Sequence, residues 1–275
     1  MGTSHRHTPT VKGEPNWGKS SSAVTGVTKD VDESNQLNDN PPPGVSPSNI
    51  AKRQSMLGKR ITTGYHHAVR NLVRAGGGRH SISNGRSRAI GHSGIFVAGG
   101  FALIFNEIAS NGLLDWLRNR GFTSLSGLSC HEILDIIKQY CEADVVGLDE
   151  TAANEALEAI LDSIEERVGD DIENLDEMMR TIVSGDELKD MIDMFFGMYI
   201  FSHLSQNFEE KLEYERGSVA MKNAMNEIKD QIMDDIRTGR SGRSVESIDW
   251  GKPEGNAFIK GEFNRILFIL QGNED

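Results

Sequence analysis

Residues 186–237 read DELKDMIDMFFGMYIFSHLSQNFEEKLEYERGSVAMKNAMNEIKDQIMDDIR, the longest helix-like run of this 275-residue chain. The run has no proline, and large apolar side chains recur in it at spacings of three and four, which places them on one helix face. The first half carries Leu188, Met191, Ile192, Phe195, Phe196, Tyr199, Ile200 and Leu204, and the second carries Val219, Met221, Met225, Ile228, Ile232, Met233 and Ile236. This pattern predicts one long helix, or two helices stacked end to end with the joint at Gly217-Ser218.

Similar patterns predict helices along most of the remaining chain. Pro253 is the one proline after Pro47, so helices meet few breaks over that distance. Ser129 and Glu132 have the spacing of a capping box, which marks a helix start. The predicted helices cover 49–75, 112–120, 129–141, 149–168, 172–183 and 258–270, and another begins at Gly94 with GIFVAGGFALIFNEIA, where Gly99-Gly100 would let a second helix approach closely. No strand-like alternation is present, so the predicted fold is an all-α multi-helix bundle.

The first 48 residues differ in composition from the rest. They are rich in Ser, Thr, Asn, Gly and Pro and hold few large apolar side chains. Such a segment buries too little apolar surface to offset its chain entropy, so we predict a disordered N-terminal tail over residues 1–48. After it we expect a basic Gly/Arg-rich helical region over 49–128 and an acidic helical bundle domain over 129–275.

The net charge of −12 is unevenly distributed. Residues 41–106 hold nine Lys or Arg and no Asp or Glu, whereas residues 107–275 sum to −20. The acidic majority disfavours non-specific binding of nucleic acid or anionic membrane over the whole surface. The basic block stays open to either partner.

No cluster of residues indicates a catalytic or metal site. The eight histidines show no zinc-ligand or catalytic spacing. Cys130-His131 is better explained as a helix-start thiol beside a solvated imidazole than as a nucleophile and its base, because neighbouring helical residues point about 100° apart. The acidic residues between Asp162 and Glu177 indicate a solvated helix face. We expect a protein without catalytic residues, metal or cofactor.

The glycine-rich stretch 76–94 is the least regular part of the chain after the tail. Its glycines and arginines could contact phosphate, but the spacing matches no nucleotide-binding motif. We predict a mobile loop or a ligand-shaped turn there. The residues that could contact nucleic acid or a partner are Arg70, Arg74, Arg79, Arg86 and Arg88.

The two cysteines and the lack of a signal peptide or a bilayer-length apolar run predict a cytoplasmic protein with no membrane partner. Met1-Gly2 is a context in which the initiator methionine is normally removed, which would leave the amine of Gly2 exposed. Myristoylation of Gly2 is disfavoured because Arg6 stands where that pattern has Ser or Thr. An exposed α-amine titrates near pH 7.7–8.0, so a substantial fraction is nucleophilic at neutral pH.

The start Met1-Gly2-Thr3-Ser4 and the passage RNLVRAGGGRHSISNGRSRAIG (residues 70–91) resemble the QatB family of the bacterial Qat anti-phage defence systems. The resemblance implies a protein without assigned catalytic activity, encoded beside an ATPase (QatA-like), a QueC-like enzyme (QatC-like) and a TatD-like nuclease (QatD-like). It also implies that the QueC-like enzyme recognises the chain and joins a deazaguanine moiety to its N-terminal amine. Gly2 would then be the acceptor, with Thr3 and Ser4 as small neighbours that enter a narrow channel.

Two alternatives remain open from the residues. One is a nucleic-acid-binding or assembly adaptor that acts through the basic segment 70–88, which would bind with a steep salt dependence. The other is an unrecognised enzyme, which a deep polar pocket with perturbed carboxylates would indicate.

Overall fold

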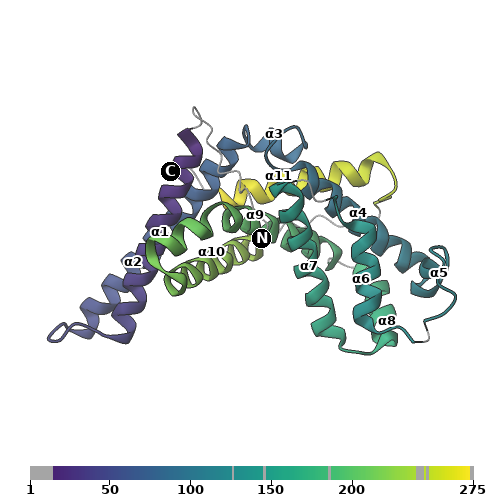
Figure 1. Ribbon diagram of the computed structural model, residues 1–275, viewed down its shortest axis with the longest axis horizontal. Coiled ribbons are helices and arrows are strands. Elements are labelled where there is room, and N and C mark those ends of the chain that lie inside the picture. The colour runs from purple at the N-terminus through teal and green to yellow at the C-terminus, as the bar shows by residue number, and fades with distance from the viewer. Residues whose placement is uncertain are drawn as a thin grey trace, which may run out of the picture.

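The computed structural model describes residues 15–125, 127–144, 147–184, 187–239, 245 and 248–272, and all regular structure among them is helical (Figure 1). The helices are α1 (Pro15–Asp39), α2 (Pro47–Ala75), α3 (Arg79–Ser83), α4 (His92–Asn111), α5 (Leu113–Arg118), α6 (Cys130–Cys141), α7 (Leu148–Val168), α8 (Ile172–Ser184), α9 (Glu187–Arg216), α10 (Ser218–Thr238) and α11 (Pro253–Leu270). The prediction of an all-α multi-helix fold is therefore confirmed. Each helix predicted after residue 48 is present, with ends that differ by a few residues.

Helices α9 and α10 join at Gly217, as the sequence predicts, but they are not stacked end to end. They fold back on each other as a hairpin, in which Gly197 of α9 lies against Ile232 and Ile236 of α10. A β-carbon at Gly197 would overlap the side chain of Ile236, so the glycine lets the two helices approach closely. The end-to-end prediction was wrong because each half carries an apolar stripe, and folding back buries the two stripes against each other.

Helix α1 corrects the predicted tail. Residues 15–39 form a 25-residue helix, while residues 1–14 lie outside the described part of the chain. Its buried face consists of Ser20, Val24, Val27, Thr28, Asp30, Val31 and Leu37. Three of these side chains are polar, and most of the others are small valines, so the stripe is too weakly apolar to stand out in the sequence. Packing against α2 stabilises it.

The contacts between α1 and α2 define their relative direction. Ser34 hydrogen-bonds Gln54 at 2.7 Å, and the hydroxyl of Ser20 donates to the carbonyl oxygen of Ala68 at 2.9 Å. Earlier residues of α1 thus pair with later residues of α2, and the two helices are antiparallel. The first turn of α1 consequently lies beside the last turn of α2, which ends at Ala75.

Helix α4 lies at the centre of the core and packs against α5, α6, α7, α8, α9 and α11. Gly100 approaches the backbone of Cys141 in α6, as predicted for a close helix contact, whereas Gly99 faces open space. Among the described helices, α4 has the length and apolar composition of a membrane span, but half of that stretch is buried inside the protein. The buried apolar residues run from Val24 to Leu270 as one cluster, so the basic and acidic regions share a core across residue 128.

The capping box predicted at the start of α6 is present. The hydroxyl of Ser129 accepts a hydrogen bond from the backbone N–H of Glu132 at 3.2 Å, and the Glu132 carboxylate accepts from the Ser129 N–H at 2.7 Å. Two helix-terminal N–H groups are thereby satisfied.

We expect Ser129→Ala to lower the free energy of unfolding by about 1 kcal/mol, because the substitution removes an N-cap acceptor. Urea denaturation followed by helical circular dichroism measures this. Ser22→Ala, within α1, is the control: its hydroxyl bonds only the carbonyl of Gly18 in its own helix, so its loss should change stability by no more than about 0.5 kcal/mol. Equal losses in the two variants would contradict the capping role.

Candidate functional site

The residues predicted to contact a partner fall into two groups. Gly2, Thr3 and Ser4 lie outside the described residues. The predicted arginines of the basic segment lie on three elements: Arg70 and Arg74 on α2, Arg79 on α3, and Arg86 and Arg88 on the loop that precedes α4.

Arg70 and Arg79 contact residues near the end of α11. The guanidinium of Arg70 donates to the carbonyl oxygen of Gln271 at 2.7 Å and ties the end of α11 to α2. The guanidinium of Arg79 lies 4.9 Å from the ring centre of Phe268, over the ring of this exposed α11 side chain. Arg86 and Arg88 are exposed. The structure therefore divides the basic segment into internal braces and outward-facing charges.

The glycine-rich stretch is held against the core. Its backbone folds back on α3, where the N–H of Arg86 donates to the carbonyl oxygen of Ser81 at 2.9 Å. Ile82 and Ile90 are buried, and both lie against Gly76. At the far end, Gly91 adopts a φ of +111° and passes so close to Ile82 that a β-carbon would overlap its carbonyl oxygen. A short helix and a fixed turn thus replace the predicted mobile loop.

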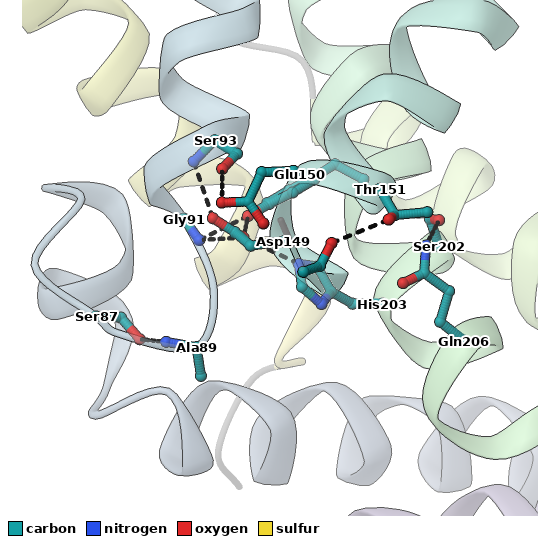
Figure 2. Close-up of polar contacts among 12 residues, drawn as sticks. Ser87, Ala89, Gly91, Ser93, Asp149, Glu150, Thr151, Ser202, His203 and Gln206 are labelled. Carbon is teal, nitrogen blue, oxygen red and sulfur yellow. Dashed lines mark hydrogen bonds and ion pairs between the residues drawn. The ribbon is translucent and has the colours of Figure 1, made fainter. Parts of the chain in front are cut away.

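One carboxylate, whose side chain is 13% exposed, holds the end of this stretch (Figure 2). Asp149, at the start of α7, accepts hydrogen bonds from the backbone N–H groups of Gly91 at 3.0 Å and Ser93 at 2.9 Å. It also accepts from the Tyr199 hydroxyl and from Nε2 of His203 at 3.2 Å, both on α9. The Gly91 N–H also reaches the Tyr199 oxygen at 2.6 Å. We call these five residues the Asp149 clasp.

The protonation of the clasp follows from its surroundings. Burial opposes ionisation of Asp149, but hydrogen bonds from His203, Tyr199 and the Ser93 N–H outweigh burial and hold the pKa of this carboxyl below its usual range. Burial, together with the Asp149 charge, raises the pKa of the Tyr199 hydroxyl well above its ordinary value. Tyr199 therefore stays a hydrogen-bond donor while Asp149 stays an acceptor.

The clasp is a structural joint rather than a catalytic dyad. An aspartate bonded to a histidine is the geometry of a general base, but such a base must reach a substrate. The side chains of His203 and Tyr199 are 2% and 0% exposed. Their polar atoms are directed at Asp149 and Gly91, so the clasp joins α7 and α9 to the N-terminus of α4.

Cys130 and His131 do not form a nucleophile and base. Cys130 is fully buried at the start of α6, and burial raises the pKa of its thiol. His131 points to solvent and pairs with Glu165 at 3.1 Å. The interpretation as a helix-start thiol beside a solvated imidazole is confirmed.

The acidic residues of α8 include one with a specific structural role. Asp176 accepts a hydrogen bond from the backbone N–H of Leu113 at 2.9 Å and pairs with Arg180, so it caps α5 from a different helix. Within the described ranges, no three His, Cys, Asp or Glu side chains lie close enough together to hold a metal ion.

Sequence reasoning missed the clasp because its parts are far apart along the chain. Asp149 and His203 are separated by 54 positions, and no local spacing relates them. The available signal was the position of the acidic Asp149 in the first turn of a predicted helix. Nothing in the sequence relates this carboxylate to the glycine-rich stretch that it binds. An acid there is usually explained by the helix dipole alone.

The helices, the shared core and the buried clasp define an all-α protein whose glycine-rich segment is a fixed part of the fold. A family model described as Qat anti-phage system associated protein QatB matches residues 83–269. The match covers more than half of the chain, and the chain belongs to this family. No curated protein and no solved structure matches it.

The matched region begins at the last residue of α3 and ends one residue before the end of α11. It contains the Asp149 clasp and the exposed Arg86 and Arg88, and it leaves out α1, α2 and the N-terminal residues. As a QatB family member, the protein is a component of an anti-phage defence system that has several proteins.

Proposed function

We propose that this protein is the substrate subunit of its defence complex, and that a QueC-like enzyme recognises its N-terminus and attaches a deazaguanine-type group to the Gly2 amine. The observation that carries the proposal is the small-residue start Met1-Gly2-Thr3-Ser4 ahead of a family-defined helical body. Helix α1 begins at Pro15, so 12 residues separate Gly2 from the first helix. That length lets the amine extend away from the body.

The body itself supports a role as substrate and platform. One of its polar arrangements, the Asp149 clasp, is directed inward. The proposal includes a cytoplasmic location, and the two buried, unpaired cysteines support it because they fit a reducing compartment. An ATPase and a TatD-like nuclease of the same system complete the proposed set of partners.

Gly2→Pro is expected to abolish modification, because proline replaces the unhindered primary amine with a ring-bound secondary amine. The chain is co-expressed with the QueC-like enzyme, and its intact mass and N-terminal peptide are measured. Gly2→Ala is the matched control, because it keeps a primary amine and adds one methyl group, and it should retain most of the mass increase.

Phage plaque counts measure whether each variant still protects the cell. Loss of protection in Gly2→Pro and its retention in Gly2→Ala would support the proposal. An unmodified N-terminal peptide in the wild-type chain, together with full protection by Gly2→Pro, would overturn it.

A further inference from the structure

The N-terminal segment leaves the body at a defined place. The antiparallel pairing of α1 with α2 continues from Ser34 and Gln54 through Val27 and Gly64 to Ser20 and Ala68. Continued in the same register, the first turn of α1 lies beside the last turn of α2. Helix α2 ends at Ala75, and α3 starts at Arg79. The described chain therefore begins beside the C-terminal end of α2, three residues before α3 starts, and α3 lies at the top of Figure 1.

A basic surface with an exposed aromatic ring is built around α3. We call it the α3 surface, and it comprises Arg79, His80, Arg86, Arg88 and Phe268. Phe268 is 54% exposed, with the Arg79 guanidinium over its ring. The backbone of Arg86 is fixed to Ser81 of α3. The Arg79–Phe268 pair and the backbone of Arg86 are thus placed by the fold itself.

The charge of the α3 surface is not neutralised by its own segment, because residues 41–106 contain no Asp or Glu. Earlier in α2, away from α3, Arg60 and Arg53 by contrast pair with Asp30 and Glu33 of α1. Arginine and aromatic side chains are enriched at the energetic centres of protein interfaces. An exposed phenylalanine under an arginine, beside two further exposed arginines, has that composition.

We infer that the α3 surface docks an acidic patch on the enzyme that acts on Gly2, an inference that rests on the proposed function. Gly2 lies 13 residues before Pro15, and a chain of that length reaches at most about 45 Å. An enzyme bound at the α3 surface would hold its active site within that reach. Docking would raise the effective concentration of the amine above that of a free peptide.

A protein partner fits the surface better than nucleic acid. Single-stranded nucleic acid binds by stacking bases on open aromatic faces, and one face of Phe268 is covered by Arg79. Residues 107–275 sum to −20, which would repel a long polyanion that extends beyond the α3 surface. A compact acidic patch would avoid that repulsion.

The test compares two double charge reversals in the full-length protein. Arg86→Glu with Arg88→Glu inverts the α3 surface, and Lys52→Glu with Lys59→Glu makes the same charge change on α2, about 24–35 Å from its C-terminal end by helix rise. Each variant is titrated against the purified QueC-like enzyme by calorimetry at low and high salt. The rate of Gly2 modification is measured for each variant and for a free peptide of residues 2–14.

We expect the α3-surface variant to bind at least about 10-fold more weakly at low salt, and the wild-type affinity to fall as salt increases. The α2 variant should stay within about twofold of wild type. The α3-surface variant should be modified at a rate close to that of the free peptide. Matching thermal midpoints for all variants would show that the charge changes leave the fold intact.

Wild-type binding and modification rate in the α3-surface variant would overturn the docking inference and leave the proposed function standing. Equal losses in both variants would also overturn it, because they would indicate a non-specific charge effect. A 20-base-pair DNA that binds wild type but not the α3-surface variant, with no binding of the enzyme, would replace the protein partner with nucleic acid. If the wild-type protein binds the enzyme through Arg86 and Arg88 but its Gly2 stays unmodified, the proposed function alone would be contradicted.

Discussion

Replacing Asp149 with alanine is expected to lower the free energy of unfolding by about 3–5 kcal/mol, the cost typical of removing one partner from a buried charged network. The substitution would leave His203, Tyr199 and the N–H groups of Gly91 and Ser93 without their shared acceptor. Urea denaturation at pH 7 measures the loss. Asp149→Asn should fall between wild type and alanine, because its amide keeps one acceptor oxygen.

Glu150 supplies the matched control. It accepts a hydrogen bond from the Ser93 hydroxyl at 3.1 Å and is only half-buried. Glu150→Gln keeps an acceptor and should change stability by less than about 1 kcal/mol. A loss as small as this in Asp149→Ala would show that the clasp does not hold α4 to α7.

The Asp149 contribution has a definite pH dependence. The pKa of this carboxyl is lower in the folded protein than in the unfolded chain. Its stabilisation is therefore fully present above the unfolded pKa, which is near 3.8, and is lost as the pH falls through the lower folded value. Wild type and Asp149→Asn should converge in stability only in strong acid.

Gly91→Ala is expected to destabilise the protein by about 2–4 kcal/mol. The residue has a φ of +111°, and an added β-carbon would overlap the backbone carbonyl of Ile82, which cannot move without shifting α3. Strain at such a φ costs about 1–3 kcal/mol, and the overlap adds to it. Thermal and urea unfolding measure the total.

Gly99→Ala, eight residues further on in α4, is the contrasting variant. Nothing lies within 4 Å of the added methyl group, and the backbone is already helical. Alanine is favoured over glycine in a helix interior by about 1 kcal/mol, so this variant should be more stable than wild type. Destabilisation by both changes would mean that α4 tolerates no added volume, rather than that Gly91 has a special conformation.

The helices with a strong apolar pattern could be predicted from the sequence because their pattern is local. The capping box at Ser129 and the run of α7 depend on residues three or four positions apart, and both appear as predicted. Helix α1 could not be predicted in the same way. Its buried positions include Ser20 and Thr28, whose hydroxyls are satisfied by backbone carbonyls within the structure.

The candidate partner-binding arginines also fall into a pair that could be predicted from the sequence and a pair that could not. Arg86 and Arg88 were identified from their charge, and they are exposed as a binding surface requires. Arg70 and Arg79 have the same charge, but they contact Gln271 and Phe268, which lie 201 and 189 positions further along the chain. Local sequence cannot distinguish these two pairs, because the difference depends on where α11 packs.

The sequence by itself determined the helical class, most helix boundaries and the opposite charges of the two regions. These properties follow from propensity, periodicity and composition, which act over a few residues. Tertiary structure decided that α1 is folded, that α9 and α10 form a hairpin, and that Asp149 closes the glycine-rich segment. Those outcomes depend on burial and hydrogen bonds between distant residues, whose energies exist only once the helices have packed.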